Sequence, residues 1–199
     1  MARITGIVLA AGTSSRFGRT KLTERIAGVP LVQRAIDALT DPEVAEIVVV
    51  LGHDADAVRS AVTLPAKGRS VENPAFATGL ASSLAAGLGA ASGWSEAAVV
   101  LLADQPGITP SHVRALVEAF EARRSRIVRL AFRDGPGPAL LAREIWPGVR
   151  SLSGDVGARA LAEAHPEWVE SVEIPEDAPP DIDTSRDLEA ARRSERRRV

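Results

Sequence analysis

The residues best suited to chemistry follow a short apolar run near the start of the sequence. Small residues there leave backbone N–H groups open to a ligand, and such amides form concavities that bind phosphate oxygens. An arginine and a lysine follow, and both side chains bind phosphate, the first as a planar fork and the second as a point charge. The segment comprises Leu9, Ala10, Ala11, Gly12, Thr13, Ser14, Ser15, Arg16, Phe17 and Gly18, and Lys21 comes shortly after.

This segment matches neither of the two common phosphate-binding signatures. No Gly-Lys-Ser/Thr closes it as in a Walker loop, and its glycines lack the G-x-G-x-x-G spacing of dinucleotide folds. Only two of the 24 basic residues in the chain are lysine, Lys21 and Lys67, so a lysine beside this loop is notable. The pattern predicts either a phosphate-binding loop or a flexible glycine-serine turn after a strand.

Two acidic segments could hold a metal ion. Asp104 follows an apolar run directly, and an unpaired carboxylate in that position is costly to desolvate. Mg²⁺ held by one or two carboxylates and by substrate phosphates would remove that cost. Asp183, just before Thr184, could be a second ligand. The alternatives are a turn-forming Asp before Pro106 and an ordinary residue before a helix cap.

A further polar segment could contact a nucleotide base. Asn73 is the only asparagine in the chain, and Gly79, Ser82 and Ser83 stand where a helix is expected to begin. Hydroxyls and unpaired amides in a first helical turn could bind the edge of a base. A helix cap with serines in its first turn explains the two serines nearly as well.

Apolar runs alternate with helical patterns, and these elements would position the polar groups. Strands are expected at residues 4–10, 45–51, 97–102 and 127–132, and helices at 30–39, 54–62, 80–88, 110–124, 154–164 and after Thr184. Gly135-Pro136-Gly137-Pro138 predicts a rigid, non-helical turn. Strands separated by helices imply a mostly parallel sheet with helices on both faces. Ligands bind outside the carboxyl ends of such strands, where the glycine loop and Asp104 fall.

Composition bounds the remaining possibilities. With 199 residues, 45% of them hydrophobic, the chain predicts one domain over 1–199 with a sizeable core. Cysteine is absent, which excludes disulfides and thiolate chemistry, and no run of about 20 apolar residues predicts a membrane span. No signal peptide is apparent, so the cytoplasm is the expected location. The net charge of −2 argues against nucleic-acid binding, and the arginine-rich end is expected to fray after about residue 193.

Together these motifs resemble the nucleotidyltransferases of the molybdenum cofactor, and the cytidylyltransferases among them in particular. The shared features are Leu-Ala-Ala-Gly-x-Ser-x-Arg-x-Gly with a following lysine, Asn-Pro before Gly-Leu-x-x-Ser, Asp-Gln-Pro after a strand, Gly-Asp-x-Gly-Ala-Arg at residues 154–159, and Asp-Ile-Asp-Thr at residues 181–184. They occur in the family's order and extend over residues 7–188. Their joint occurrence is far more specific than any one motif.

The resemblance implies a single-domain, Rossmann-like α/β nucleotidyltransferase fold and a Mg²⁺-dependent enzyme. A nucleotidyl group, CMP from CTP, would pass to a phosphorylated acceptor, the molybdenum pterin, with release of pyrophosphate. Lys21, Arg16 and Asp104 would be catalytic, and Asp104 and Asp183 would bind the metal. The nucleotide would contact Leu9, Ala10, Ala11, Gly12, Ser14, Arg16, Lys21, Asn73, Gly79, Ser82 and Ser83, and the acceptor would contact Gly137, Pro138, Gly154 and Asp155.

Alternatives within and outside the family remain open. The Ala-Ala-Gly of the loop is typical of the cytidylyl branch, whereas the guanylyl branch shows Ala-Gly-Gly. The family's Pro-Gly-His-Pro turn reads Gly135-Pro136-Gly137-Pro138 here and has no histidine, which leaves another phosphorylated acceptor open. The other hypotheses are a non-catalytic cofactor carrier that serves a molybdoenzyme and a redox protein of the same family.

Overall fold

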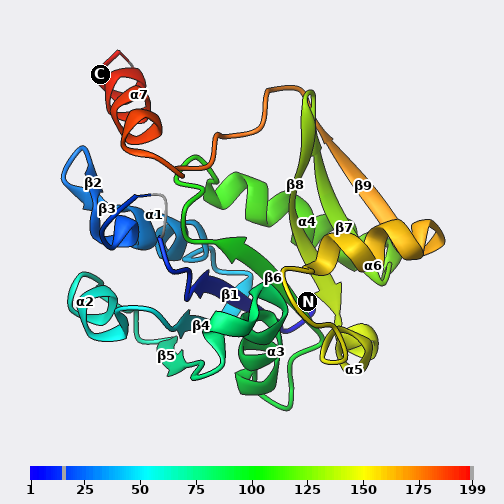
Figure 1. Ribbon diagram of the computed structural model, residues 1–199. Helices are drawn as coiled ribbons and strands as arrows, with labels where there is room; N and C mark the ends of the chain where they lie inside the picture. The colour runs from blue at the N-terminus through cyan, green and yellow to red at the C-terminus, as the bar shows by residue number, and fades with distance from the viewer. Residues whose placement is uncertain (15–16, 198–199) are drawn as a thin grey trace.

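The computed structural model describes residues 1–14 and 17–197, and a seven-stranded sheet runs through its centre (Figure 1). The strand order is β5-β4-β1-β6-β8-β7-β9. The strands pair in parallel except where β8 pairs with β6 and β7. They are β1 (Ile4–Ala10), β4 (Val44–Leu51), β5 (Gly68–Glu72), β6 (Ala97–Leu102), β7 (Ile127–Phe132), β8 (Gly135–Ala142) and β9 (Val169–Ile174).

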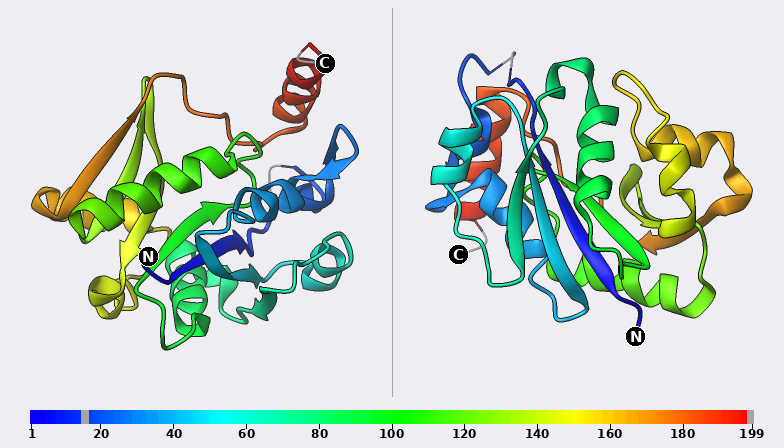
Figure 2. Two further views of the ribbon diagram at one scale, coloured as in Figure 1. Left: turned by 180° about the vertical axis from the view of Figure 1, so that it is seen from behind. Right: turned by 90° about the horizontal axis from the view of Figure 1, so that it is seen from below.

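Helices cover both faces of this sheet (Figures 1 and 2). One face packs against α1 (Leu31–Ala38) and α4 (Pro110–Arg123), and the opposite face against α3 (Leu80–Ala90), α5 (Trp146–Val149) and α6 (Ala158–Ala164). The central strand β1 is therefore buried along its whole length. That double burial is why its sequence is a continuous apolar run rather than an alternating one.

The predicted fold class is confirmed, and most predicted elements are present. The strands expected at 4–10, 97–102 and 127–132 have those bounds, and the strand expected at 45–51 begins one residue earlier. Thr109 caps α4, as its position before a proline predicts, and its backbone N–H donates to His112 Nδ1 at 3.2 Å. The helix expected at 154–164 begins only at Ala158.

The turn expected at Gly135–Pro138 is wrong, because these residues begin strand β8. Proline has no N–H to donate, so a central strand normally excludes it. Here β8 pairs with β6 only from Ala139 onward, so both prolines lie beyond the ladder on that side. On the other side, the register with β7 shifts between Arg129 and Ala131, which accommodates Pro136.

The chain after β9 returns to the carboxyl end of β6. Ile182 donates its backbone N–H to the Asp104 carbonyl at 3.0 Å, and α7 (Ser185–Arg196) follows. Thr184 and Asp187 form the predicted capping box of α7. This helix continues to Arg196, three residues beyond the position after which the sequence predicts a frayed end.

Helix α7 packs beside the small hairpin of β2 (Arg25–Ile26) and β3 (Val29–Pro30) (Figure 1). A separate apolar cluster holds them together; it comprises Phe17, Ile26, Leu31, Ile182 and Leu188. The short helix α2 (Ala55–Ser60) follows β4. Among residues 1–14 and 17–197, no helix is long and apolar enough to cross a membrane.

Candidate functional site

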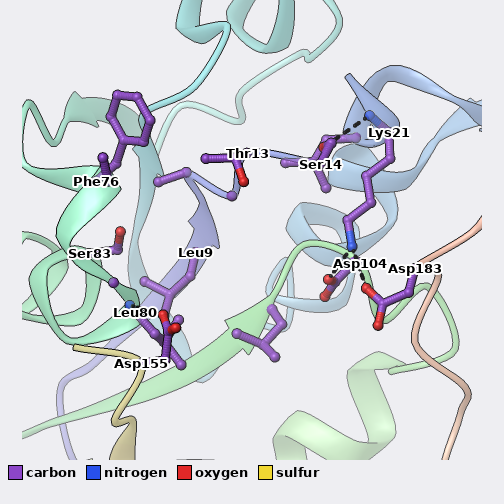
Figure 3. Close-up of a pocket in the computed structure, with 16 residues that line it drawn as sticks. Leu9, Thr13, Ser14, Lys21, Phe76, Leu80, Ser83, Asp104, Asp155 and Asp183 are labelled. Carbon is purple, nitrogen blue, oxygen red and sulfur yellow. Dashed lines mark hydrogen bonds and ion pairs between the residues drawn. The ribbon is translucent and has the colours of Figure 1, made fainter. Parts of the chain in front are cut away.

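A cavity of about 680 Å³ opens at the carboxyl ends of β1 and β6 (Figure 3). We call it the nucleotide pocket. The glycine loop and Lys21 line one part, and the start of α3 lines another. Its lining residues are Leu9, Ala11, Gly12, Thr13, Ser14, Lys21, Leu22, Phe76, Ala77, Gly79, Leu80, Ser83, Leu102, Asp104, Asp155 and Asp183.

Lys21 connects Asp104 and Asp183, two of the carboxylates that line this pocket (Figure 3). Its Nζ lies 2.8 Å from Asp104 Oδ2 and 2.9 Å from Asp183 Oδ1, and the residue is only 8% exposed. Burial alone would lower the pKa of Lys21, but the charges and hydrogen bonds of Asp104 and Asp183 outweigh it and raise the pKa. Lys21 is therefore a fixed ammonium ion at neutral pH.

The loop positions Lys21 through its backbone. Ser14 has a left-handed backbone, with φ of 51°, and its Oγ accepts a hydrogen bond from the Lys21 N–H at 3.2 Å. Residues Lys21–Thr23 then form a short 3-10 helix that carries the lysine under the loop. Arg16, the other predicted cation, lies outside the described residues.

The two carboxylate oxygens of Asp104 differ in their contacts. Lys21 neutralises Asp104 Oδ2. The other oxygen, Oδ1, is buried and has no hydrogen-bond partner among the described residues. A buried oxygen in that state is costly, and either a hydrogen-bond donor or a cation would satisfy it. Asp104 therefore retains coordination capacity beyond the ion pair with Lys21.

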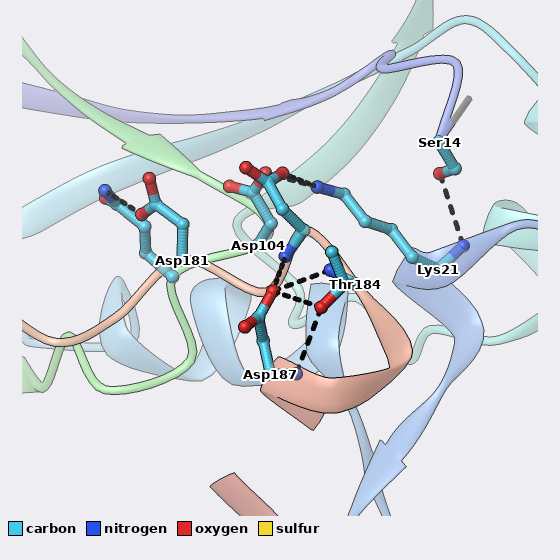
Figure 4. A network of polar contacts seen from close by, with 8 residues as sticks. Ser14, Lys21, Asp104, Asp181, Thr184 and Asp187 are labelled. Atoms are coloured by element: carbon cyan, nitrogen blue, oxygen red, sulfur yellow. Dashed lines mark hydrogen bonds and ion pairs between the residues drawn. The ribbon is translucent and has the colours of Figure 1, made fainter. Parts of the chain in front are cut away.

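Asp183 owes its place to the start of α7. Asp187 Oδ2 accepts the backbone N–H groups of Asp183 at 3.2 Å and of Thr184 at 2.7 Å (Figure 4). Hydrogen bonds from Thr184, and then from the Asp183 backbone, lower the pKa of Asp187 and keep it ionised. The capping box thus fixes the backbone that presents the Asp183 carboxylate to Lys21.

The polar residues near α3 bind mainly to one another. Asn73 Nδ2 donates to Ser82 Oγ at 2.9 Å and to Ser83 Oγ at 3.1 Å, while Asn73 Oδ1 accepts from the Ala75 N–H. Ser83 lines the nucleotide pocket, but Asn73, which is buried, and Ser82 do not. Asn73 therefore acts as a brace beneath the pocket wall rather than as part of its surface.

Gly79 meets the segment before α6 at very close range. A Cβ on Gly79 would lie 2.3 Å from the Gly154 carbonyl carbon, and its φ of 116° belongs to glycine. The Ala81 N–H donates to the Gly154 carbonyl at 3.1 Å, and the Leu80 N–H donates to Asp155 Oδ1 at 3.3 Å. The Asp155 carboxylate thus closes one side of the nucleotide pocket.

A second cavity of about 310 Å³ adjoins the first, and Leu9, Leu80 and Leu102 line both. We call it the acceptor cavity. Gly137 and Pro138 line it, whereas Asp155 lines the nucleotide pocket and Gly154 lines neither. Of the four residues that the sequence assigns to the acceptor, two therefore line the acceptor cavity, one lines the nucleotide pocket and one lines neither.

Like Asn73 and Ser82, a third residue predicted to contact the nucleotide does not line the pocket, and two residues that no motif predicts line the cavities. Ala10 is fully buried in the core and does not line the nucleotide pocket. Phe76 lies on the pocket wall and Arg129 lines the acceptor cavity, although no motif singles either out. Arg129 occupies the third place in an apolar strand, and only its charge within that run could have drawn attention to it.

The arrangement can bind a polyanion beside a carboxylate pair. Lys21 and the loop amides supply positive charge, while Asp104 and Asp183 supply oxygens for a cation. Among the described residues, no cluster of three or more His, Cys, Asp or Glu could hold a metal ion. A cation held by these two carboxylates would therefore need further oxygens from a ligand, as Mg²⁺ commonly does.

Comparisons with known proteins agree with this geometry. Residues 6–169 match the family model for the MobA-like NTP transferase domain. The nicotine blue oxidoreductase of Paenarthrobacter nicotinovorans is 32% identical over 192 residues, which cover 91% of this chain and 92% of that protein.

Two solved structures show the same fold over almost the whole chain. The homologue of Mycobacterium tuberculosis Rv0371c from Mycobacterium sp. strain JC1 is 31% identical with a TM-score of 0.87, covering 99% of this chain and 98% of that one. The manganese complex of Rv0371c from M. tuberculosis is 25% identical with a TM-score of 0.81, covering 96% and 98%. The chain belongs to the MobA-like NTP transferase family.

Proposed function

We propose that the protein transfers a nucleotidyl group, CMP from CTP, to a phosphorylated acceptor, the molybdenum pterin cofactor. An oxygen of the acceptor phosphate would attack the α-phosphorus, and the bond from that phosphorus to the bridging oxygen of the β-phosphate would break. Pyrophosphate would leave with that oxygen. The observation that carries the proposal is the Lys21 ammonium held between Asp104 and Asp183 on the floor of the nucleotide pocket.

Asp104 and Asp183 would hold a divalent cation, which we propose to be Mg²⁺. The buried Asp104 Oδ1, which has no partner among the described residues, supports this fit. The manganese complex of Rv0371c supports a divalent metal in a relative. When bound, the cation would neutralise charge on the phosphates.

Lys21 and the loop would bind and orient the triphosphate. An acceptor phosphate is already nucleophilic, so the reaction needs positioning and charge stabilisation rather than a proton-abstracting base. Lys21 would donate to phosphate oxygens, and the N–H groups of residues 11–14 would line the same side. Arg16 is proposed to assist on the basis of the sequence motif alone.

Ala11 supports the choice of CTP over GTP. It lies 5% exposed in the pocket wall, packed where a Cβ on Gly52 would come within 2.7 Å of it. A methyl group at this position leaves less room for a purine than the glycine of the guanylyl branch. Competition between CTP and GTP for binding should favour CTP, and a preference for GTP would move the protein to the guanylyl branch.

The acceptor would enter from the side of Gly137 and Pro138. The histidine-free sequence of this strand makes the acceptor the least constrained part of the proposal, and other phosphorylated acceptors are alternatives. Delivery of the product to a molybdoenzyme and action in the cytoplasm are the corresponding expectations.

Pyrophosphate release tests the proposal directly. The wild-type protein should release pyrophosphate only when CTP, Mg²⁺ and molybdopterin are all present. Asp104→Asn should lose most turnover, roughly 10²–10³-fold by comparison with other electrostatic groups, and Asp183→Asn somewhat less. Asp177→Asn, a change at an exposed ion pair outside the pocket, is the matched control. Near-normal turnover in Asp104→Asn with unchanged Mg²⁺ dependence would refute the metal assignment.

Melting curves separate a catalytic loss from unfolding. In Asp104→Asn, Lys21 keeps its partner Asp183 at 2.9 Å, so we expect the fold to remain intact. Binding of molybdopterin without turnover would instead support the cofactor carrier.

The second candidate function is redox, and the relative named nicotine blue oxidoreductase favours it. The chain has no G-x-G-x-x-G segment for a dinucleotide. Consumption of NADH or NADPH in the presence of an oxidised acceptor, with no pyrophosphate from CTP, would establish the redox function in place of nucleotidyl transfer.

A further inference from the structure

The acceptor cavity is mainly apolar, but two arginines, Arg129 and Arg159, line it. It lies between α3 and α6 on one side and strands β6, β8 and β7 on the other. Apolar side chains such as Leu84, Val100 and Ile127 form most of its walls. Arg129, at the middle of β7, lines this cavity.

Among residues 1–14 and 17–197, no carboxylate forms an ion pair with Arg129. Its neighbours across the sheet are Ala139 on β8 and Ser171 on β9, both small. Its Nε is buried and has no hydrogen-bond partner within the described part of the chain. Arg34 also has a buried Nε without a partner, but its Nη2 donates to the Ile26 carbonyl and to Glu195. Leaving a buried guanidinium N–H unpaired is costly, so a ligand is the natural partner for Arg129.

The charges around the cavity favour an anion. Arg159, from the first turn of α6, lines it as well. Asp181 is the one carboxylate among its described lining residues, and the Gln105 amide binds it at 2.8 Å. The Gln105 amide is thus the hydrogen-bond partner of Asp181, and among the described residues no ion pair joins Asp181 to Arg129.

A residue of each neighbouring cavity has a buried polar atom that lacks a hydrogen-bond partner among the described residues. We call this atom the orphan of its cavity, and the two orphans are of opposite kinds. In the nucleotide pocket the orphan is an acceptor, Asp104 Oδ1, which suits a cation. In the acceptor cavity it is a donor, Arg129 Nε, which suits an oxyanion. Asp104, Asp183 and Lys21 do not line the acceptor cavity, and Arg129 does not line the nucleotide pocket.

We propose that Arg129 recognises a carboxylate or phosphate group of the acceptor, bound in the cavity beside the nucleotide pocket. The assignment to an acceptor rests on the proposed function, whereas the anion site itself stands on the geometry of Arg129. A guanidinium presents its N–H groups as a fork that matches both oxyanions, and charge-assisted hydrogen bonds of this kind are the strong ones. The substrate class is therefore an acceptor with an apolar body and an oxyanion that Arg129 holds.

The signal of the Arg129 Nε–H group in ¹⁵N NMR spectra tests the site. Arg129→Met identifies the signal by removing it, and the thioether side chain preserves the apolar stem. Titration of wild-type protein with inorganic phosphate, and separately with acetate, should shift this signal and saturate. The stronger of the two responses tells which oxyanion the site prefers. A signal that moves with neither anion would overturn the proposal.

Variants separate this site from the phosphate site proposed at Lys21. In Lys21→Met, phosphate should still shift the Arg129 signal and still raise the melting temperature. In the double variant Lys21→Met, Arg129→Met the rise should disappear. Adding Arg133→Met instead should leave the rise intact, because Arg133 is an exposed arginine paired with Asp177. Equal stabilisation of both double variants by phosphate would refute the role of Arg129.

Calorimetry with CTP and Mg²⁺ keeps the two proposals distinguishable. Arg129→Met should bind CTP within about twofold of wild type, because Arg129 does not line the nucleotide pocket. Failure of the wild-type protein to bind CTP would contradict the proposed function and leave the anion site at Arg129 standing.

Discussion

The Lys21 ammonium group lies between the two carboxylates that would also bind a metal ion. This group contacts both Asp104 and Asp183, so a cation that binds these carboxylates must share or displace it. Ion pairs of this kind hold like-charged carboxylates together when no metal is bound. The same contact keeps the lysine beside the nucleotide pocket, as its proposed role in binding phosphate requires.

Replacing Lys21 by methionine should make stability depend on metal. We expect the free energy of unfolding to fall by about 1–3 kcal/mol in EDTA, because Asp104 loses its partner. Mg²⁺ should then raise the melting temperature of Lys21→Met more than that of wild type. Lys67→Met is the control: Lys67 binds the Thr40, Asp41 and Val44 carbonyls, so its loss should destabilise without rescue by Mg²⁺. An identical Mg²⁺ response in all three proteins would contradict the exchange.

The pH dependence of this stabilisation follows from the raised pKa of Lys21. The folded state binds the proton more tightly than the unfolded state does. The contribution is therefore complete below the unfolded value of about 10.4 and is lost as pH rises through the folded pKa. The difference in stability between wild type and Lys21→Met in EDTA should accordingly shrink only in strongly alkaline buffer.

Gly79 tests how closely two parts of the pocket wall must approach. Gly79→Ala would force a Cβ to within 2.3 Å of the Gly154 carbonyl carbon at an unfavourable φ. We expect a loss of about 1–3 kcal/mol in stability and weaker CTP binding, since Leu80 and Asp155 would separate. Gly93→Ala meets no atom within 4 Å and should change neither quantity. Unchanged CTP affinity in Gly79→Ala would show that this contact does not shape the pocket.

At the scale of elements, one buried carboxylate, that of Glu46, joins the amino ends of β1, β4 and β5, at the edge of the sheet opposite the nucleotide pocket. Glu46 on β4 accepts hydrogen bonds from Thr5 on β1 at 3.0 Å and from the Ser92 N–H and Oγ, and it pairs with Arg69 on β5. Glu46 is 5% exposed. Burial would raise its pKa, but the hydrogen bonds from Arg69, Ser92 and Thr5 outweigh it and lower the pKa.

Glu46→Gln should therefore destabilise the sheet in a pH-dependent manner. Weakening the hydrogen bonds of this buried group costs about 1–3 kcal/mol at neutral pH, because Arg69 is itself 42% exposed and stays hydrated. The contribution of a carboxylate with a lowered pKa is present above its unfolded pKa, about 4.3, and is lost as pH falls through the folded value. Denaturant unfolding at pH 7 and at pH 3 should show a large and then a smaller difference from wild type. Glu72→Gln, at an exposed pair with Arg59, should have little effect at either pH.

The sequence predicts the elements that are buried on both faces and misses those at the edges. β1, β6 and β7 are apolar runs with clear ends, so their bounds are correct. The edge strands β5, Gly-Arg-Ser-Val-Glu, and β9, Val-Glu-Ser-Val-Glu-Ile, are half exposed and too polar to stand out. The sequence predicts a turn where β8 begins. That prediction is wrong because local rules for proline do not include the partner strand, and β6 stops pairing with β8 before the prolines are reached.

The candidate site shows the same division. Sequence motifs predict Lys21 after the glycine loop, Asp104 at the carboxyl end of a strand, where a parallel sheet places its ligands, and Asp183 before the last helix as a possible second metal ligand. The pairing of Lys21 with both carboxylates depends on contacts across 83 and 162 residues of sequence, which spacing does not reveal. The sequence does not predict Arg129 for a related reason. Only the folded structure shows that it lines a cavity and that its Nε has no partner among the described residues.

At the scale of the whole molecule, the site depends on the docking of α7. Leu188 is 2% exposed in the cluster with Phe17, Ile26, Leu31 and Ile182, apart from the two main cores. Arg192 adds hydrogen bonds to the Arg25 carbonyl at 2.9 Å and to Glu24 at 3.2 Å. The helix is thus attached to the hairpin rather than to the sheet.

Leu188→Ala should loosen α7 and so displace Asp183. We expect about 2–5 kcal/mol of local destabilisation and a higher Mg²⁺ concentration for half-maximal pyrophosphate release. Leu116→Ala, a change at a fully buried residue of the main core, should lower the melting temperature and leave the Mg²⁺ dependence unchanged. The same Mg²⁺ dependence in both variants would separate Asp183 placement from α7 docking.

The long separation between Lys21 and Asp183 also sets a schedule for the newly made chain. These residues are 162 positions apart, and ribosomes add about 5–20 residues per second, so roughly 8 to 30 s pass between them. During that interval Lys21 and Asp104 can meet, but the second carboxylate does not yet exist. A nascent chain can therefore begin to assemble its central strands early, whereas it gains the complete carboxylate pair only when translation has passed residue 183.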